Sequence, residues 1–213
     1  MPKLKICGLK RPQDIQYVNR FSPDYIGFVF AKSSRQVTLQ EAYSLREQLN
    51  SGILSVGVFV NEKPERIEEL AEKGIIDMVQ LHGDESVEYV ELLRQRLAKG
   101  RKKGPEIIKA IRVASAQDVL RSLDYPADFL LFDTYTKGQY GGSGQCFNWQ
   151  LLKEVKRPFF LAGGLDIHKI KKAAEEVRPY GLDISSAAET KGQKDEEKIR
   201  QLVEGVRKIR LQQ

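Results

Sequence analysis

The chain has 213 residues, of which 41% are hydrophobic and 30% are charged, and its formal net charge is +6. This composition is typical of one ordinary globular domain or a compact barrel. It excludes a membrane-spanning protein, because no window approaches the roughly 18 consecutive apolar residues of a transmembrane helix. The N-terminal segment lacks the apolar core of a signal peptide, and Cys7 and Cys146 form no disulfide or zinc pattern. We therefore expect a cytoplasmic protein without membrane contact.

The positive charge comes from one short run. Residues 94–103 contain six basic residues and no acidic residue, in a chain with 35 basic and 29 acidic residues, so the remainder is neutral. Such a run is usually a solvated helix end and loop, and no nucleic-acid-binding signature accompanies it. We expect no nucleic-acid partner, and the role of the run stays open.

Short apolar runs with the length of buried strands recur along the chain. We expect eight strands, at residues 3–7, 25–30, 53–60, 77–81, 107–111, 129–132, 158–161 and 181–184. Residues with helical spacing follow each strand. Thr38 with Glu41 forms a capping box, and Asn148 and Asp166 can cap helices after the sixth and seventh strands, the first of them starting at Trp149.

Eight strands that alternate with eight helices predict parallel β-α-β units throughout. Because no linker or change in composition divides the chain, we expect a single (β/α)8 barrel, a TIM barrel, over residues 1–213. A doubly wound open sheet of the same elements is the competing architecture.

The segment from Phe129 to Trp149 is the one around which the expected site is organised. Its buried strand ends on one carboxylate, Asp133, and four glycines follow within residues 138–144. A lone carboxylate where a buried strand ends, before a glycine-rich loop, is how a parallel α/β protein presents a catalytic group. Asp is also common at the start of a turn, so this second interpretation of Asp133 is open.

The active site of such a barrel lies at the carboxyl ends of its strands. This rule places four polar residues at one mouth: Cys7, His82, Asp133 and Asp183. It also places there the small residues Gly163-Gly164 and Ser185-Ser186, where barrels usually bind phosphate. Gly163-Gly164 could be only a tight turn, but two adjacent loops of the same character favour a phosphate site.

Other residues at this mouth have two interpretations each. Cys7 is either a small buried hydrophobic residue or a general base whose pKa falls toward neutrality. Lys5 shares its face and would need a carboxylate partner if it points into the barrel. His82 is either a substrate contact or a structural hydrogen-bonding residue. We expect Cys146 to pack against its neighbours and His168 to lie at the surface of a helix.

Seven motifs, in order from the first strand to the last helix, resemble phosphoribosylanthranilate isomerase. They are KICG at 5–8, GFVF at 27–30, VGVFVN at 56–61, VQLHG at 79–83, YGGSG at 140–144, AGGL at 162–165 and DISS at 183–186. No single motif is specific, but their combination is. The resemblance implies an Amadori rearrangement of N-(5-phosphoribosyl)anthranilate, a small phosphosugar substrate, in tryptophan biosynthesis. It implies no metal or organic cofactor.

The resemblance also implies roles for individual residues. Asp133 would be the general acid that protonates the furanose ring oxygen and opens the ring to an imine, which requires a raised pKa. Cys7 would be the general base that takes the proton from the ribose carbon next to the imine carbon. Arg35 would bind the anthranilate carboxylate, which its planar fork suits. His82 and Asp183 would be further substrate contacts.

The phosphate would bind the backbone of the two small-residue loops, that is, Gly163, Gly164, Ser185 and Ser186. The chain departs from the family pattern here, because many members have Gly-Val-Glu where this chain has Ala187-Ala188-Glu189. Ala tolerates a positive φ poorly, so we expect a phosphate loop of slightly different shape.

Two classes of alternative remain. Another phosphosugar enzyme on the same barrel is disfavoured, because indoleglycerol-phosphate synthase should carry a longer N-terminal extension and strand-end lysines, and the histidine-pathway isomerase should have Asp at position 7. A non-catalytic barrel that binds anionic partners would use residues 94–103, on the face opposite the expected site. The sequence leaves open whether the protein is a monomer or a homodimer, whether it accepts the histidine-pathway substrate, how mobile residues 134–144 are, and which step limits turnover.

Overall fold

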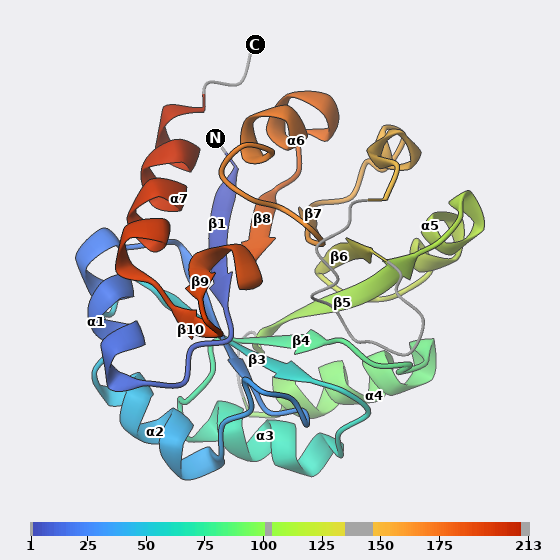
Figure 1. Ribbon diagram of the computed structural model, residues 1–213. Coiled ribbons are helices and arrows are strands. Elements are labelled where there is room, and N and C mark those ends of the chain that lie inside the picture. Colours follow the sequence, from blue (N-terminus) through green and yellow to red (C-terminus); the bar gives the residue numbers. More distant parts are fainter. Residues whose placement is uncertain (1, 101–103, 135–146, 210–213) are drawn as a thin grey trace.

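The structure is a computed structural model, and it describes residues 2–100, 104–134 and 147–209. Eight parallel strands form a closed barrel, in which each strand pairs with the next and the last pairs with the first (Figure 1). They are β1 (Lys3–Cys7), β2 (Tyr25–Val29), β3 (Leu54–Phe59), β4 (Met78–Leu81), β5 (Glu106–Val113), β6 (Phe129–Thr134), β7 (Phe159–Leu161) and β8 (Gly181–Ile184). The closure confirms the expected barrel and excludes the open doubly wound sheet.

The described residues contain seven α-helices, which surround the barrel (Figure 1). They are α1 (Pro12–Phe21), α2 (Leu39–Glu47), α3 (Pro64–Glu72), α4 (Val87–Ala98), α5 (Ala116–Ser122), α6 (Ile170–Val177) and α7 (Glu196–Lys208). The expected capping box is present before α2, where Thr38 Oγ1 accepts from the Glu41 backbone N–H and the Glu41 carboxylate accepts from the Thr38 backbone N–H. Pro64 occupies the first turn of α3, where its missing N–H costs nothing.

The prediction of an α-helix that starts at Trp149 is wrong. The chain forms only one 3-10 turn there, η1 (Trp149–Leu152), and Asn148 caps it by accepting from the Gln150 backbone N–H at 3.1 Å. Pro158 disfavours helical geometry in the residue before it, and β7 begins directly after it. The capping signal was therefore correct, but the segment is too short for an α-helix.

Asp166 also caps a turn in place of a helix. Its carboxylate accepts from the backbone N–H groups of His168 and Lys169, and α6 begins at Ile170. His168 is exposed, as expected, but it lies in this turn and not inside the helix.

The barrel has an apolar interior and a polar mouth. Tyr25, Val56, Ile108, Leu131 and Phe160 pack inside it, and the outward side chains of the strands form a separate core with the helices. Strand alternation directs one inward residue near the carboxyl end of most strands toward the mouth. These inward residues include Cys7, Gln80, Asp133 and Asp183, and they position the site.

Two arginines of the basic run pack α4 against its neighbours. Arg94 donates to Asp128 and to the carbonyl oxygen of Pro126, and Arg96 donates to Glu65 and Glu68. Both lie before β5, at the end of the barrel away from the mouth, and residues 101–103 lie outside the described residues. In the described part of the chain, no helix has the length and apolar character needed to span a bilayer.

Candidate active site

One cavity opens at the carboxyl ends of the strands. All nine residues expected in the site line it, namely Cys7, Arg35, His82, Asp133, Gly163, Gly164, Asp183, Ser185 and Ser186. They come from segments far apart in the sequence, which the closed barrel brings to one place. Cys146 and the glycines of residues 138–144 lie outside the described residues.

Lys5, Cys7 and Asp183 form the wall of this cavity at the junction of β1 and β8. The Lys5 ammonium is fully buried and donates to both carboxylate oxygens of Asp183, each at 3.0 Å. A Cβ on Gly27 would lie 2.7 Å from Cys7 Sγ and 3.2 Å from Lys5 Nζ, so the absence of a side chain there lets the thiol and the ammonium approach each other. Asp183 is thus the carboxylate that a buried Lys5 needs, in addition to lining the cavity.

The surroundings of Cys7 affect the protonation of its thiol. Burial raises the pKa of the thiol and the Asp183 carboxylate raises it further, while Lys5 and Lys194 only partly offset them. Burial also opposes the charge of Lys5, but Asp183 and Cys7 outweigh it and raise the pKa of the ammonium. The raised pKa favours the protonated thiol in the unliganded chain, so the fall in pKa on which a general-base role of Cys7 depends requires a change that ligand binding brings.

Asp133 lies inside β6 and not after it. The strand continues to Thr134 because Asp133 and Thr134 pair with Arg112 and Val113 of β5. Asp133 is 4% exposed; its Oδ1 accepts from the Thr134 backbone N–H at 2.8 Å, and its Oδ2 lies 3.4 Å from His82 Nε2. One carboxylate oxygen is thus fixed by the backbone, and the other faces the histidine.

Gly163 is required next to this carboxyl group. Its φ is +81°, and a Cβ there would lie 2.4 Å from Thr134 Oγ1 and 2.7 Å from Asp133 Oδ1. Gly164 follows with a φ of +66°, so both glycines adopt a conformation that other residues rarely take.

The second small-residue loop is tied to Cys7. Ser185 Oγ donates to the Cys7 carbonyl oxygen at 3.1 Å, and a short 3-10 turn, η2 (Ser186–Ala188), follows. Ala187 lies in this turn without a positive φ, so its replacement of glycine imposes no backbone strain here.

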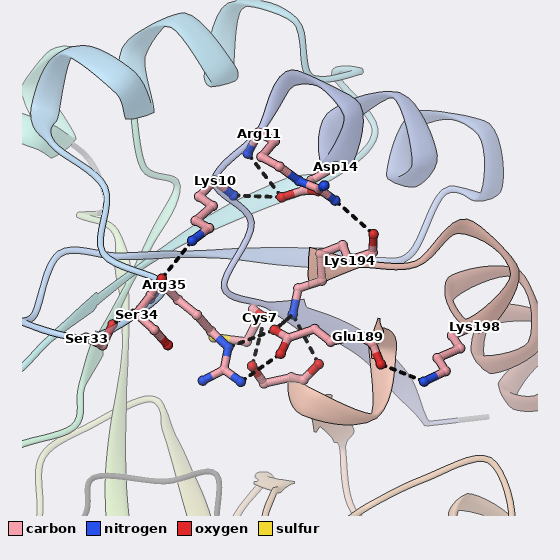
Figure 2. Close-up of polar contacts among 11 residues, drawn as sticks. Cys7, Lys10, Arg11, Asp14, Ser33, Ser34, Arg35, Glu189, Lys194 and Lys198 are labelled. Carbon is pink, nitrogen blue, oxygen red and sulfur yellow. Dashed lines mark hydrogen bonds and ion pairs between the residues drawn. The ribbon is translucent and has the colours of Figure 1, made fainter. Parts of the chain in front are cut away.

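Arg35 is held by a buried carboxylate at the edge of the cavity (Figure 2). Its Nε and Nη2 donate to the two oxygens of Glu189 at 2.7 and 2.8 Å, and the Lys194 ammonium donates to the same carboxylate at 2.6 Å. Lys194 also donates to the Ser185 carbonyl oxygen at 3.1 Å. Burial opposes the charge of Glu189, but the hydrogen bonds from Arg35 and Lys194 lower its pKa to about 2. One carboxylate therefore connects Arg35 with the loop at Ser185.

Sequence reasoning missed three residues of this site: Gln80, Glu189 and Lys194. Glu189 follows η2 and Lys194 lies in the two-residue strand β10 (Gln193–Lys194), which pairs with β9 (Glu189–Thr190). A charged residue in a short hairpin gives no sign of burial in the sequence. Gln80 had a usable signal, because a polar residue at an inward position of a buried strand needs a partner.

Comparison with known proteins agrees with this geometry. Residues 4–205 match the family model for N-(5'-phosphoribosyl)anthranilate (PRA) isomerase. An N-(5'-phosphoribosyl)anthranilate isomerase from Endomicrobium trichonymphae is 47% identical over 209 residues, which cover 98% of this chain and 100% of the relative.

Solved structures show the same architecture. Phosphoribosyl anthranilate isomerase from Thermotoga maritima superposes with a TM-score of 0.85 at 32% identity, over 97% of this chain and 99% of the other. A structure of the isomerase in complex with reduced 1-(o-carboxyphenylamino)-1-deoxyribulose 5-phosphate gives 0.82 at 31% identity, with the same two shares covered. From the cavity, the family model and these relatives together, we conclude that the chain belongs to the N-(5'-phosphoribosyl)anthranilate isomerase family.

Proposed function

We propose that this protein catalyses the Amadori rearrangement of N-(5'-phosphoribosyl)anthranilate in tryptophan biosynthesis. The observation that carries the proposal is that a thiol, a carboxyl group, an arginine and two loops of small residues line one cavity in a chain of this family. The substrate has a matching set of features: a sugar ring to open, a carboxylate and a phosphate.

Asp133 acts as the general acid in this proposal. It gives its proton to the furanose ring oxygen, the bond from that oxygen to the anomeric carbon breaks, and the nitrogen lone pair forms an iminium. Burial at 4% exposure and a fixed Oδ1 leave Oδ2 as the oxygen available for this transfer. A carboxyl group in such a site can donate a proton at neutral pH only if it is itself protonated.

Cys7 acts as the general base in the second step. Its sulfur takes the proton from the ribose carbon next to the iminium carbon, and the electrons of that bond form the enolamine, which tautomerises to the ketone. Because the pKa of the thiol is raised in the unliganded chain, Cys7 has to release its own proton to solvent before its sulfur can accept another, and positive charge nearby lowers the pKa and makes this release favourable. The iminium supplies this charge, so ring opening precedes proton abstraction.

Binding uses the two ends of the cavity. Arg35 keeps Nη1 and one edge of its guanidinium free of Glu189, and a second carboxylate can bind there bidentately. The backbone at Gly163, Gly164, Ser185 and Ser186 holds the phosphate, with His82 and Asp183 as further contacts on the sugar. The proposal needs no metal or organic cofactor.

The loss of substrate fluorescence tests the proposal, with phosphoribosylanthranilate generated in situ. We expect rapid loss with the wild-type protein, and a kcat lower by about 10²–10⁴-fold for Cys7→Ala and Asp133→Asn, since each removes one proton-transfer group. Cys146→Ala is the matched control for loss of a thiol and should turn over normally. A slow wild-type protein would overturn the activity, and near-normal turnover by either variant would overturn that residue's role.

A further inference from the structure

Gln80 is a buried polar residue that the proposed reaction does not use. It lies on the inward face of β4 at 1% exposure, and it lines the same cavity as Asp133. Its Nε2 lies 2.9 Å from Nδ1 of His82, two residues along the chain. The side chain therefore contacts a histidine that in turn faces the catalytic carboxyl group.

One atom of this pair points to a ligand. Within the described residues, Gln80 Oε1 is buried and has no hydrogen-bond partner, while His82 Nε2 has only the longer contact with Asp133 Oδ2 at 3.4 Å. A buried polar group is costly to leave unpaired, so Gln80 Oε1 at the cavity is expected where a ligand supplies the missing bond. The substrate offers hydroxyl groups and an anilino N–H as donors for Gln80 Oε1.

The contact between the two side chains assigns the position of the histidine proton. An amide NH2 group only donates, so Nδ1 of His82 has to accept, and a neutral ring then carries its proton on Nε2. This Nε2–H faces Asp133 Oδ2 at 3.4 Å. Asp133 Oδ2 can accept from this N–H, so Asp133 favours the same tautomer that the amide imposes, from the other side of the ring.

We propose that Gln80 is a positioning residue that keeps His82 neutral with its proton on Nε2, an inference that rests on the proposed role of Asp133. In this tautomer His82 cannot accept the proton of Asp133, so that proton goes to the substrate. After the transfer, Nε2–H donates to the new carboxylate more strongly than to the carboxyl group before it. The bond therefore stabilises the transition state more than the ground state.

The other charged groups around His82 are engaged elsewhere. From β5, Lys109 donates to Glu85 and to the Gly83 carbonyl oxygen, and Arg112 pairs with Asp84. The remaining charged groups of the cavity form their own pairs, Lys5 with Asp183 and Arg35 with Glu189. Among the described residues, Gln80 and Asp133 are thus the polar side chains that face the two ring nitrogens of His82.

The nitrogen NMR spectrum of the ¹⁵N-histidine-labelled protein tests this directly, because the chain has only two histidines. His168→Asn assigns the signals, and His168, in an exposed turn, serves as the internal reference. At neutral pH we expect His82 Nδ1 to show the chemical shift of a nitrogen without a proton, and Nε2 that of an N–H. A proton on Nδ1 in the wild-type protein would overturn the proposal.

Two substitutions at position 80 separate a positioning role from a packing role. Gln80→Glu places an acceptor at Nδ1, so His82 should become an imidazolium or move its proton to Nδ1. Gln80→Met keeps the volume but removes the donor, so His82 should lose its single tautomer. Gln16→Glu, at an exposed site of α1, is the matched control and should leave both histidines unchanged.

The activity of the same variants links the tautomer to the reaction. We expect kcat to fall about tenfold to a hundredfold in both, and the basic limb of the pH–rate profile to move to lower pH in Gln80→Glu, because an imidazolium favours the deprotonated form of Asp133. An unchanged His82 spectrum in both folded variants contradicts the proposal. An inactive wild-type protein with the expected spectrum would overturn the function and leave the tautomer assignment intact, so the two failures are distinguishable.

Discussion

At the scale of single residues, Glu189 shows how the site depends on partners that are distant in the sequence. Arg35 lies 154 positions away from it, yet the two form a bidentate pair, and Lys194 adds a second cation to the same carboxylate. Glu189 and Lys194 are almost fully buried, with side chains 7% and 1% exposed. The carboxylate is therefore necessary to the charge balance of the site, whether or not it touches the substrate.

Replacement of Glu189 by Gln should change how stability depends on pH. The pKa of Glu189 is lowered to about 2 in the folded chain, so its contribution is complete above the unfolded value near 4.5 and is lost as the pH falls toward 2. We expect Glu189→Gln to cost about 3 kcal/mol at pH 7, because the buried Lys194 and the half-buried Arg35 lose their anion, and to flatten the loss of stability between pH 5 and 3.

Urea unfolding at a series of pH values measures this effect. Glu197→Gln is the matched control, because Glu197 also accepts from cationic and amide partners, Arg200 and Gln201, but on an exposed side chain where solvent screens the interaction. The control should leave both the stability and its pH dependence nearly unchanged. Equal losses in the two variants would contradict the prediction.

At the scale of the elements, the site depends on how closely the loop after β7 approaches β6. A Cβ on Gly163 would lie 2.4 Å from Thr134 Oγ1 and 2.7 Å from Asp133 Oδ1, which is too close for any side chain. The same glycine therefore belongs to the expected phosphate loop and to the packing around the Asp133 carboxyl group. A substitution at Gly163 that alters this loop should therefore also shift the Asp133 side chain.

Gly163→Ala should lower kcat about a hundredfold, because the added methyl group displaces Asp133 from its position. The strain of a positive φ adds about 1–2 kcal/mol of destabilisation. Gly74→Ala is the control, since Gly74 also has a positive φ, of +67°, but an added Cβ there meets no described atom within 4 Å. We expect Gly74→Ala to lose the stability that the positive φ costs while its kcat stays normal. A normal kcat for Gly163→Ala would refute the packing argument.

The sequence predicted the elements better than it predicted their ends. Apolar runs located all eight strands, because each strand is buried on both faces. The last residues of β5 and β6, however, pair with each other beyond the apolar runs, and only the neighbouring strand decides how far each continues. The partners of Lys5 and Arg35 were beyond prediction for a similar reason, since periodicity says nothing about contacts across more than 150 residues.

At the scale of the whole molecule, a buried ion pair lies where the barrel closes. Lys5 of β1 and Asp183 of β8 are register partners in the ladder that joins the first strand to the last. Their side chains are 0% and 8% exposed, so neither charge is well solvated. The pairing of β8 with β1 that closes the barrel therefore also brings the Asp183 carboxylate to the Lys5 ammonium.

Asp183→Asn should destabilise the protein by about 3–5 kcal/mol, because it leaves a buried ammonium without its anion. The double variant Lys5→Met/Asp183→Leu should recover most of this loss, since apolar side chains can replace a buried pair. The exposed pair of Lys73 and Glu69 provides the control, and Glu69→Gln should leave the stability nearly unchanged. Unfolding midpoints in urea at pH 7 measure these differences in stability. If Asp183→Asn lowers the stability no more than Glu69→Gln does, the prediction is wrong.

The pairing of β1 with β8 also has a consequence in time. Lys5 and Asp183 are separated by 178 residues, so at about 5–20 residues per second a ribosome delivers them roughly 9 to 36 s apart. Throughout that interval the nascent chain carries Lys5 without its counterion and Cys7 without Ser185 beside it. The Cys7 thiol, although made among the first residues, acquires these surroundings only when the eighth strand arrives, so the site can form only after nearly the whole chain has been synthesised.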